Sequence, residues 1–150
     1  ALSPGESVHM SQPVGFFYPP DETTPRIFLA GGIGIVPLMS ILRAGSERGE
    51  HPPTLLLYSN RTAETIVYVR ELATMSGATF HVEYFLTRDS APDFPAQKKR
   101  IDTEALHHTS KRFPRANWYL CGGISFVRDM RLALKRLSVP EGSIFTESFF

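Results

Sequence analysis

Phe28-Leu29-Ala30-Gly31-Gly32-Ile33-Gly34-Ile35-Val36-Pro37-Leu38-Met39 decides the fold of this chain, because an apolar run meets a glycine-rich turn and then a helical pattern. The apolar start predicts a buried strand, and the stretch from Pro37 predicts a helix. Gly31, Gly32 and Gly34 can adopt positive φ and let a phosphate or a sugar approach the backbone closely. A helix that starts here presents free N–H groups to an anion. The run therefore predicts a strand–turn–helix corner that is able to hold a nucleotide.

The glycine run matches neither standard nucleotide motif completely. The dinucleotide fingerprint G-x-G-x-x-G requires a glycine where Pro37 stands, and no Gly-Lys-Ser/Thr follows for a phosphate loop. A plain strand–turn–helix corner therefore explains this run as well as a nucleotide site does.

Short apolar runs alternate with helical patterns along the rest of the chain. Strands are expected at residues 26–30, 54–59, 79–87, 117–121 and 143–149, and helices at 37–48, 63–75, 102–108 and 124–137. Uninterrupted apolar runs such as Leu55-Leu56-Leu57 suit strands that are covered on both faces. The fold class is therefore α/β, with a doubly wound, five-stranded parallel sheet in the order 3-2-1-4-5. Residues 90–100 are expected to form a loop without structure of its own.

In such a sheet the strand order reverses between the first and the fourth strand, and ligands bind in the crevice at their carboxyl ends. Gly31-Gly32-Ile33-Gly34 follows the first strand, and Cys121-Gly122-Gly123 ends the fourth. The two glycine turns are therefore expected to meet in one crevice, which favours a nucleotide site over a plain corner.

Composition limits the partners and the class of protein. A chain of 150 residues suits one domain with a sizeable core. Its 16 Lys and Arg against 15 Asp and Glu leave a net charge of +1, which argues against nucleic acid or an anionic membrane surface as the main partner. No apolar run is long enough for a membrane span, no secretory signal core is visible in residues 1–12, and one cysteine allows no internal disulfide. The five histidines lack metal-ligand spacing, so no metal is expected.

Four motifs in chain order resemble the C-terminal pyridine-nucleotide domain of the ferredoxin–NADP reductase superfamily. Residues 30–37 resemble the family's Gly-Gly-Thr-Gly-Ile-Ala-Pro turn, and Tyr58-Ser59-Asn60-Arg61 with residues 68–72 resembles its second strand and the helix that follows. Tyr119-Leu120-Cys121-Gly122-Gly123 resembles its Tyr-x-Cys-Gly-Pro segment, and residues 144–149 resemble its Glu-x-aromatic ending. By overall look the chain is similar to the eukaryotic oxidoreductase NAD-binding domain-containing proteins.

The resemblance implies hydride transfer between NAD(P)H and FAD, with onward electron transfer to an acceptor that the sequence does not identify. Residues 1–20 look like the tail of the family's flavin-binding barrel, and residues 26–150 look like the NAD(P)-binding domain. The family's Arg-x-Tyr-Ser flavin motif has no match here, so the chain is expected to be a fragment that binds no FAD tightly without a flavin domain. The resemblance also implies an intracellular, mitochondrial location.

In the glycine turn, the resemblance assigns the pyrophosphate and ribose of the nucleotide to Gly31, Gly32, Ile33, Gly34, Ile35 and Pro37. Ile33 stands where the family has threonine, so one hydroxyl contact is lost. At the end of the fourth strand, Gly122 and Gly123 belong to the same site. Gly123 replaces a proline of the family, which predicts a more mobile loop.

Three residues are expected to act at the hydride-transfer site by the same resemblance. Cys121 matches the cysteine that lies beside the nicotinamide and the flavin ring. Glu147 matches an acidic residue that supports hydride transfer, and Phe149 matches an aromatic residue that covers the flavin ring. From residue type alone, Cys121 reads equally as a small buried hydrophobe, and the other two as ordinary residues of a terminal strand.

The adenosine end of the nucleotide is assigned to Ser59, Asn60, Arg61, Thr87, Arg88, Arg100 and Phe126. Thr87-Arg88 and Arg100 resemble positions of NADPH-using relatives, and Lys98-Lys99 adds positive charge. Asp102 stands where such relatives often carry a tyrosine, and its carboxylate would repel a phosphate. A solvated basic loop explains residues 98–100 as well as a specific site does, and the balance favours NADH slightly over NADPH.

Two other functions compete with this interpretation. In a non-catalytic nucleotide-binding module, Ile33 and Gly123 would mark lost turnover, and the domain would serve a partner protein. An S-adenosylmethionine methyltransferase also uses a glycine turn after its first strand. It would need an acidic residue at the end of the second strand, where Tyr58-Ser59-Asn60 provides none.

Overall fold

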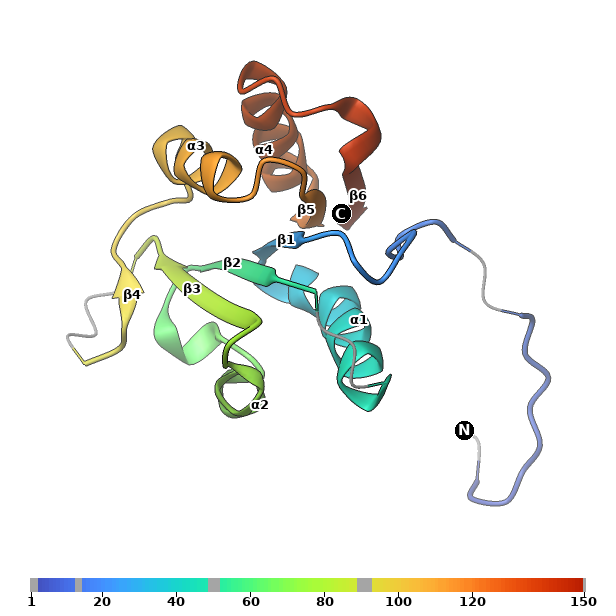
Figure 1. The fold of residues 1–150 in the computed structure, drawn as a ribbon. Helices are drawn as coiled ribbons and strands as arrows, with labels where there is room; N and C mark the ends of the chain where they lie inside the picture. Colours follow the sequence, from blue (N-terminus) through green and yellow to red (C-terminus); the bar gives the residue numbers. More distant parts are fainter. Residues whose placement is uncertain (1–2, 13–14, 49–51, 89–92, 150) are drawn as a thin grey trace.

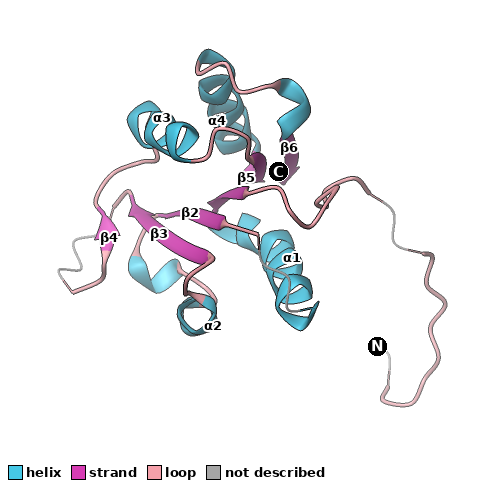
Figure 2. Ribbon diagram, viewed as in Figure 1, coloured by secondary structure: helices cyan, strands magenta, loops and turns pink. Residues whose placement is uncertain are grey.

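The computed structural model describes residues 3–12, 15–48, 52–88 and 93–149, which fold into a parallel sheet with helices on both faces (Figures 1 and 2). In the described residues the sheet has six strands: β1 (Arg26–Gly31), β2 (Thr54–Asn60), β3 (Phe80–Leu86), β4 (Ala96–Gln97), β5 (Asn117–Gly123) and β6 (Ile144–Phe149). The helices are α1 (Ile35–Arg48), α2 (Val69–Met75), α3 (Thr103–Arg112) and α4 (Ile124–Arg136).

Each central strand contributes side chains to two separate apolar cores, because successive residues of a strand point to opposite faces. From β1, Phe28 and Ala30 pack with α1 and α2, whereas Ile27 and Leu29 pack with α3 and α4. Figure 1 shows these two helix pairs on opposite sides of the sheet. Burial on both faces explains why the central strands are uninterrupted apolar runs. Throughout the described ranges, the helices are too short or too polar to cross a lipid bilayer.

The strand order β4-β3-β2-β1-β5-β6 confirms the predicted doubly wound topology, with one additional strand. The prediction of five strands was wrong because β4 forms within residues 90–100, which were expected to be a structureless loop. This two-residue strand pairs with β3 through Tyr84 and Phe85. The Phe94 ring also packs edge-on against Tyr84, with ring centroids 5.1 Å apart, and this contact brings the loop against the sheet.

The helix predicted over residues 63–75 is broken in the structure. A short 3-10 turn covers Ala63–Thr65, and α2 begins only after Tyr68, whose φ of 62° lies in the left-handed region. A left-handed residue cannot continue a right-handed helix. Elsewhere α1 begins at Ile35, two residues before its predicted start, and α3 runs on to Arg112, four residues past its predicted end.

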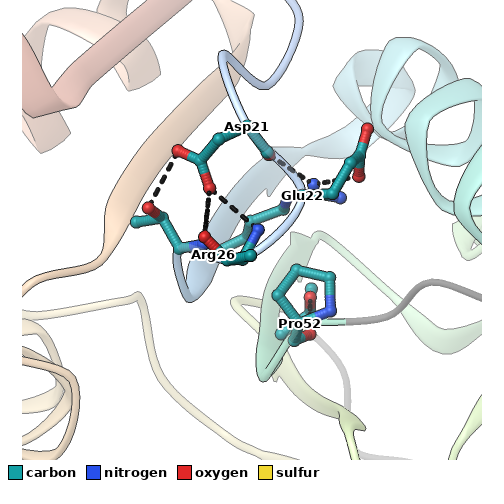
Figure 3. Close-up of polar contacts among 7 residues, drawn as sticks. Asp21, Glu22, Arg26 and Pro52 are labelled. Atoms are coloured by element: carbon teal, nitrogen blue, oxygen red, sulfur yellow. Dashed lines mark hydrogen bonds and ion pairs between the residues drawn. The ribbon is translucent and has the colours of Figure 1, made fainter.

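The segment that leads into β1 is held by a polar cluster, which Figure 3 shows around Asp21, Glu22 and Arg26. The Asp21 carboxylate accepts hydrogen bonds from the backbone N–H groups of Thr23 and Thr24, at 2.8 and 2.6 Å. Arg26, whose side chain is 4% exposed, donates to the Asp21 carbonyl at 2.9 Å and to the Glu22 carboxylate at 2.6 Å. This cluster joins the N-terminal segment to the edge of the sheet where the strands begin.

Residues 1–20 were expected to be the tail of a flavin-binding barrel. Pro13 and its neighbour at 14 lie outside the described residues. In the described part, residues 3–12 and 15–17 belong to no strand, and Figure 1 shows the N-terminal stretch running away from the sheet. The described part of this tail therefore forms no strand, and its assignment to a flavin-binding barrel stays a prediction.

Candidate functional site

The corner between β1 and α1 is a short 3-10 turn over Gly32–Gly34. Gly32 takes a φ of +54°, a conformation that costs glycine little and other residues more. Pro37 is the third residue of α1, where its missing N–H is harmless because first-turn N–H groups have no partner within the helix. The turn therefore leaves backbone donors at the carboxyl end of β1.

The two glycine turns touch each other through their backbones. A Cβ atom on Gly34 would lie 2.1 Å from the Cys121 carbonyl oxygen and 2.6 Å from the Gly122 nitrogen. Only a residue without a side chain fits so close to another backbone. β1 also pairs directly with β5, with Ala30 opposite Cys121. The predicted convergence of the two turns is thus confirmed, although they are far apart in sequence.

The Phe126 ring covers this junction from the first turn of α4. A Cβ atom on Gly31 would lie 2.8 Å from the ring, and one on Gly122 would lie 2.9 Å from it. Gly122 also has a φ of +157°, which side chains rarely allow. Glycine at both positions lets Phe126 lie on the backbone between the two strands and separate two pockets.

The first pocket lies beside the glycine turn and has a volume of about 460 Å³. Its walls come from the ends of β1 and β2, the segment after β2, and the start of α4. They are formed by Gly31, Gly32, Ile33, Tyr58, Asn60, Arg61, Thr65, Val67, Gly123 and Phe126. We call this the turn pocket.

Two buried polar groups in the wall of the turn pocket lack partners. The Tyr58 hydroxyl and the Asn60 side-chain nitrogen form no hydrogen bond with any described residue, and the two residues are 0% and 6% exposed. Burial raises the pKa of Tyr58, so its hydroxyl is protonated at neutral pH and can donate. Unpaired buried donors are rare in proteins and call for an acceptor.

The second pocket lies on the other side of Phe126 and has a volume of about 430 Å³. It runs along α4 and faces the start of α3. Its walls are formed by Ser59, Thr87, Arg100, Ile101, Asp102, Thr103, Ser125, Phe126, Asp129, Met130, Ala133 and Arg136. We call this the α4 pocket.

Most predicted nucleotide-binding residues therefore gather at one crevice, but several do not face it. Gly34 and Gly122 are buried between the two turns, and Ile35 lies in the core, so these residues lie behind the crevice and do not line it. Pro37 lines a separate pocket with Phe17 and residues of α1, so it does not face the crevice and its assignment to the nucleotide stays a prediction. The helix turns its side chain away from the crevice. Arg88 is exposed and lies in neither pocket wall, because the chain leaves the sheet there.

The three predicted catalytic residues lie on neighbouring positions of β5 and β6. Cys121 pairs with Glu147, and Gly123 pairs with Phe149. Cys121 has no exposed surface. Burial and the nearby Glu147 carboxylate raise the pKa of the Cys121 thiol to about 12, so it is a neutral, covered group. Glu147 and Phe149 are half-buried, and Glu147 lines a different pocket, with Phe145 and residues 15–18.

Sequence reasoning missed several residues of the two pocket walls. Three of them are Tyr58, near the end of β2, and Thr65 and Val67, in the segment after it. Nothing in the local sequence pattern indicated that they share a wall with the glycine turn. Ser125, Asp129 and Arg136 lie on one face of α4, a face that helical spacing could have revealed once Phe126 was assigned.

The sequence pattern of one known family matches most of the chain. The family is described as the oxidoreductase NAD-binding domain, and the match covers residues 28–132. The chain belongs to this family. The matched stretch includes both glycine turns and Phe126, so the oxidoreductase NAD-binding domain is the unit that forms the crevice.

Relatives of this NAD-binding domain are longer proteins. A flavohemoprotein of Candida albicans is 32% identical over 93% of this chain and 36% of its own length. The reductase component of a Ralstonia naphthalene 1,2-dioxygenase/salicylate 5-hydroxylase system is 26% identical over 99% of this chain and 46% of its own length. A ferredoxin NADP⁺ reductase structure from Neisseria gonorrhoeae with bound FAD and NADP shares the fold with a TM-score of 0.75 and 25% identity, over 91% of this chain and 61% of that one. The chain thus spans less than half the length of these two sequence relatives.

Proposed function

We propose that the chain is the nucleotide-binding domain of a flavin-dependent NAD(P)H oxidoreductase, which transfers hydride between NAD(P)H and FAD and passes electrons on to an acceptor. The observation that carries the proposal is the backbone contact of Gly34 with Cys121 and Gly122. It brings two glycine turns together at the point where the strand order reverses, beside the turn pocket. Open α/β sheets bind their ligands at this point. Membership in the family supports the same assignment.

The chemistry of the turn pocket suits the pyrophosphate of a dinucleotide. Tyr58 and Asn60 contribute unpaired donors, and Arg61 contributes a positive charge. The glycine turn adds backbone N–H groups at the start of a helix. The described wall of this pocket contains no carboxylate. The pyrophosphate, which carries one negative charge on each phosphate, would therefore meet donors and no carboxylate in the described wall.

The same crevice suits the two ends of a dinucleotide. Phe126 borders both pockets, so adenosine in the α4 pocket and pyrophosphate in the turn pocket would lie on its two sides. The nicotinamide end would then lie toward β5 and β6, where Cys121, Glu147 and Phe149 stay predicted catalytic residues. When bound, the nicotinamide supplies the hydride. The Cys121 thiol is neutral and polarizable, and it is covered in this structure, so its contact with the nicotinamide stays a prediction.

FAD belongs in this proposal to a flavin domain of the whole protein. The relative from Neisseria gonorrhoeae holds FAD and NADP together in a chain of which this one covers 61%. The acceptor of the electrons is not assigned, and the mitochondrial location stays a prediction.

Nucleotide binding is tested by placing a negative charge in the turn pocket. Ile33 is 64% exposed in its wall, so Ile33→Asp adds repulsion without disturbing the core. Leu132 is 48% exposed on α4 and lines neither pocket, so Leu132→Asp is the matched control. We expect calorimetric titration with NADP⁺ and NAD⁺ to show binding that Ile33→Asp weakens about tenfold and Leu132→Asp leaves unchanged. Equal weakening by both variants would refute the site.

Hydride transfer is tested on the full-length protein that carries a flavin domain. We expect anaerobic addition of NADH or NADPH to bleach the absorbance of its oxidised flavin. A non-catalytic nucleotide-binding module would bind the nucleotide and leave the flavin oxidised. Binding without bleaching would therefore replace the reductase with that alternative.

A further inference from the structure

The α4 pocket contains four charged side chains in its described wall. The acidic ones form ion pairs with neighbouring residues, whereas the basic ones do not. The two acidic residues are Asp102 and Asp129, and the two basic residues are Arg100 and Arg136. Hydroxyl groups of Ser59, Thr87, Thr103 and Ser125 complete the polar part of the wall. Because the carboxylates and the guanidinium groups are equal in number, their partners decide the charge that a ligand meets.

Both carboxylates are already occupied by neighbouring groups. Asp102 accepts a hydrogen bond from the Ala105 N–H at 2.8 Å and forms an ion pair with Lys99 at 2.7 Å. The Lys99 ammonium and this N–H lower the pKa of the Asp102 carboxyl, so it stays ionised and bound to them. Asp129 accepts two hydrogen bonds from the Arg128 guanidinium, at 3.0 and 2.9 Å. Each acid is therefore paired with a neighbouring cation, although both Asp129 bonds are made by one of its two oxygens.

The two arginines of the pocket have no such partner. Among the described residues, neither Arg100 nor Arg136 forms an ion pair or a hydrogen bond of its side chain. They come from separate elements, because Arg100 precedes α3 and Arg136 is the last residue of α4. Both line one cavity, so a ligand there meets two unpaired guanidinium groups.

This charge pattern separates the two nicotinamide nucleotides, which differ by one phosphate on the adenosine ribose. A site for NADH commonly uses a carboxylate to accept from the ribose 2′-hydroxyl, whereas a site for NADPH uses arginine to bind the 2′-phosphate. Among the described residues, the ends of β2 and β3 provide no carboxylate, since Ser59 and Asn60 end β2, Arg61 follows it, and Thr87 and Arg88 follow β3. Asp89, the next residue in the sequence, lies outside the described residues. In the described wall of the α4 pocket, the two carboxylates have ion-pair partners and the two guanidinium groups have none.

We propose that this domain selects NADPH over NADH, and that Arg100 and Arg136 bind the 2′-phosphate in the α4 pocket. The inference rests on the proposed function, because it assigns adenosine to this pocket. Arg136 is the new residue, and it lies outside every sequence motif considered above. The preference for NADH drawn from the sequence rested in part on repulsion by Asp102, and the ion pair with Lys99 removes that part of the argument.

The test uses the 150-residue chain and four ligands in calorimetric titrations. NADP⁺ is compared with NAD⁺, and adenosine 2′,5′-bisphosphate is compared with 5′-AMP, which lacks only the 2′-phosphate. We expect the ligand with the 2′-phosphate to bind about tenfold tighter in each pair, as befits charge-assisted hydrogen bonds. Arg136→Gln and Arg100→Gln should each reduce this ratio about fivefold and leave 5′-AMP affinity nearly unchanged.

A matched control separates a specific contact from general attraction of anions. Arg115 is exposed, has no partner among the described residues and lines a different pocket, so Arg115→Gln removes the same charge elsewhere. An equal loss of preference in Arg115→Gln and Arg136→Gln would overturn the proposal. All three arginines are exposed, so we expect each variant to fold. Thermal melts followed by circular dichroism check this.

The outcomes also separate this inference from the proposed function. If the chain binds NAD⁺ as tightly as NADP⁺ or more tightly, the inference fails and the nucleotide-binding function stands. If it binds none of the four ligands, the proposed function fails together with the inference.

Discussion

Gly34 lies where the two glycine turns meet, so its lack of a side chain has a measurable consequence. In Gly34→Ala the new methyl group would lie 2.1 Å from the Cys121 carbonyl oxygen, and backbone would have to move. We expect a loss of about 3 kcal/mol in the free energy of unfolding, as for an overpacked core. Urea unfolding followed by fluorescence of the buried Trp118 measures it.

The control for this substitution is Gly142→Ala. Gly142 lies in the turn Glu141–Ser143, has no positive φ, and has no atom within 4 Å of an added Cβ. Its substitution should change the free energy of unfolding by less than about 1 kcal/mol. If the two variants unfold at the same urea concentration, the result would contradict the close backbone contact of Gly34 with the second glycine turn.

Cys121 should make the domain less stable in alkaline solution. Burial raises the thiol pKa from 9.0 to about 12, so in this pH range the unfolded chain loses a proton that the folded chain keeps. The stabilisation is complete below pH 9.0 and is lost as the pH rises toward 12. Tyr119, whose pKa burial raises to about 12, acts in the same direction. In Cys121→Ala, the free energy of unfolding should therefore fall less steeply above pH 9.0 than in the unchanged chain. Identical slopes would contradict the covered position of the thiol.

At the scale of elements, the start of α3 depends on one side chain. Asp102 precedes Thr103 and accepts the Ala105 N–H at 2.8 Å, which satisfies one of the free donors of the first turn. Asp102→Ala should lower the free energy of unfolding by about 1 kcal/mol. Asp102→Asn keeps an acceptor and loses only the exposed ion pair with Lys99, so it should cost less than about 0.5 kcal/mol. Thermal melts of both variants test this, and a larger cost for Asn would show that the ion pair matters more than the cap.

The elements were predictable from sequence to different degrees. The strands β1, β2 and β5 were found because they are apolar runs buried on both faces, a signal that each run carries by itself. The strands β3 and β6 include polar, partly exposed residues and were still found as extended segments at the expected spacing. The two-residue β4 carries no such signal, since Ala96 and Gln97 become a strand only by pairing with β3. The break before α2 was missed because the left-handed φ of Tyr68 is a backbone state that residue type does not announce.

At the scale of the whole molecule, the N-terminal region divides into an exposed part and a part that packs against the rest of the fold. The described residues 3–12 are exposed and bond only locally, from Ser3 to Glu6. Phe17 packs edge-on against the buried Tyr119, and Glu22 holds the buried Arg26. Removal of residues 1–12 should therefore leave the melting temperature within about 2 °C of the unchanged chain.

Glu22→Ala serves as the contrast to that deletion. In this variant the buried Arg26 guanidinium keeps the Asp21 carbonyl as its one partner among the described residues. We therefore expect the free energy of unfolding to fall by about 2 kcal/mol. Differential scanning calorimetry of the deletion and of Glu22→Ala compares the two parts. A large loss in the deletion would mean that residues 1–12 contact the sheet.

The sequence by itself determined the α/β class, the strand order and the family, because burial patterns and glycine turns are local properties of the chain and connection handedness restricts the topology. It also named Gly31, Asn60, Arg61, Gly123 and Phe126, which line the turn pocket. Only the tertiary structure decided that Tyr58 carries an unpaired hydroxyl in that wall and that Arg100 and Arg136 lie in one cavity. It likewise decided that Asp102 is paired with Lys99. These properties depend on which side chains from separate elements come within hydrogen-bond distance, and packing sets that distance.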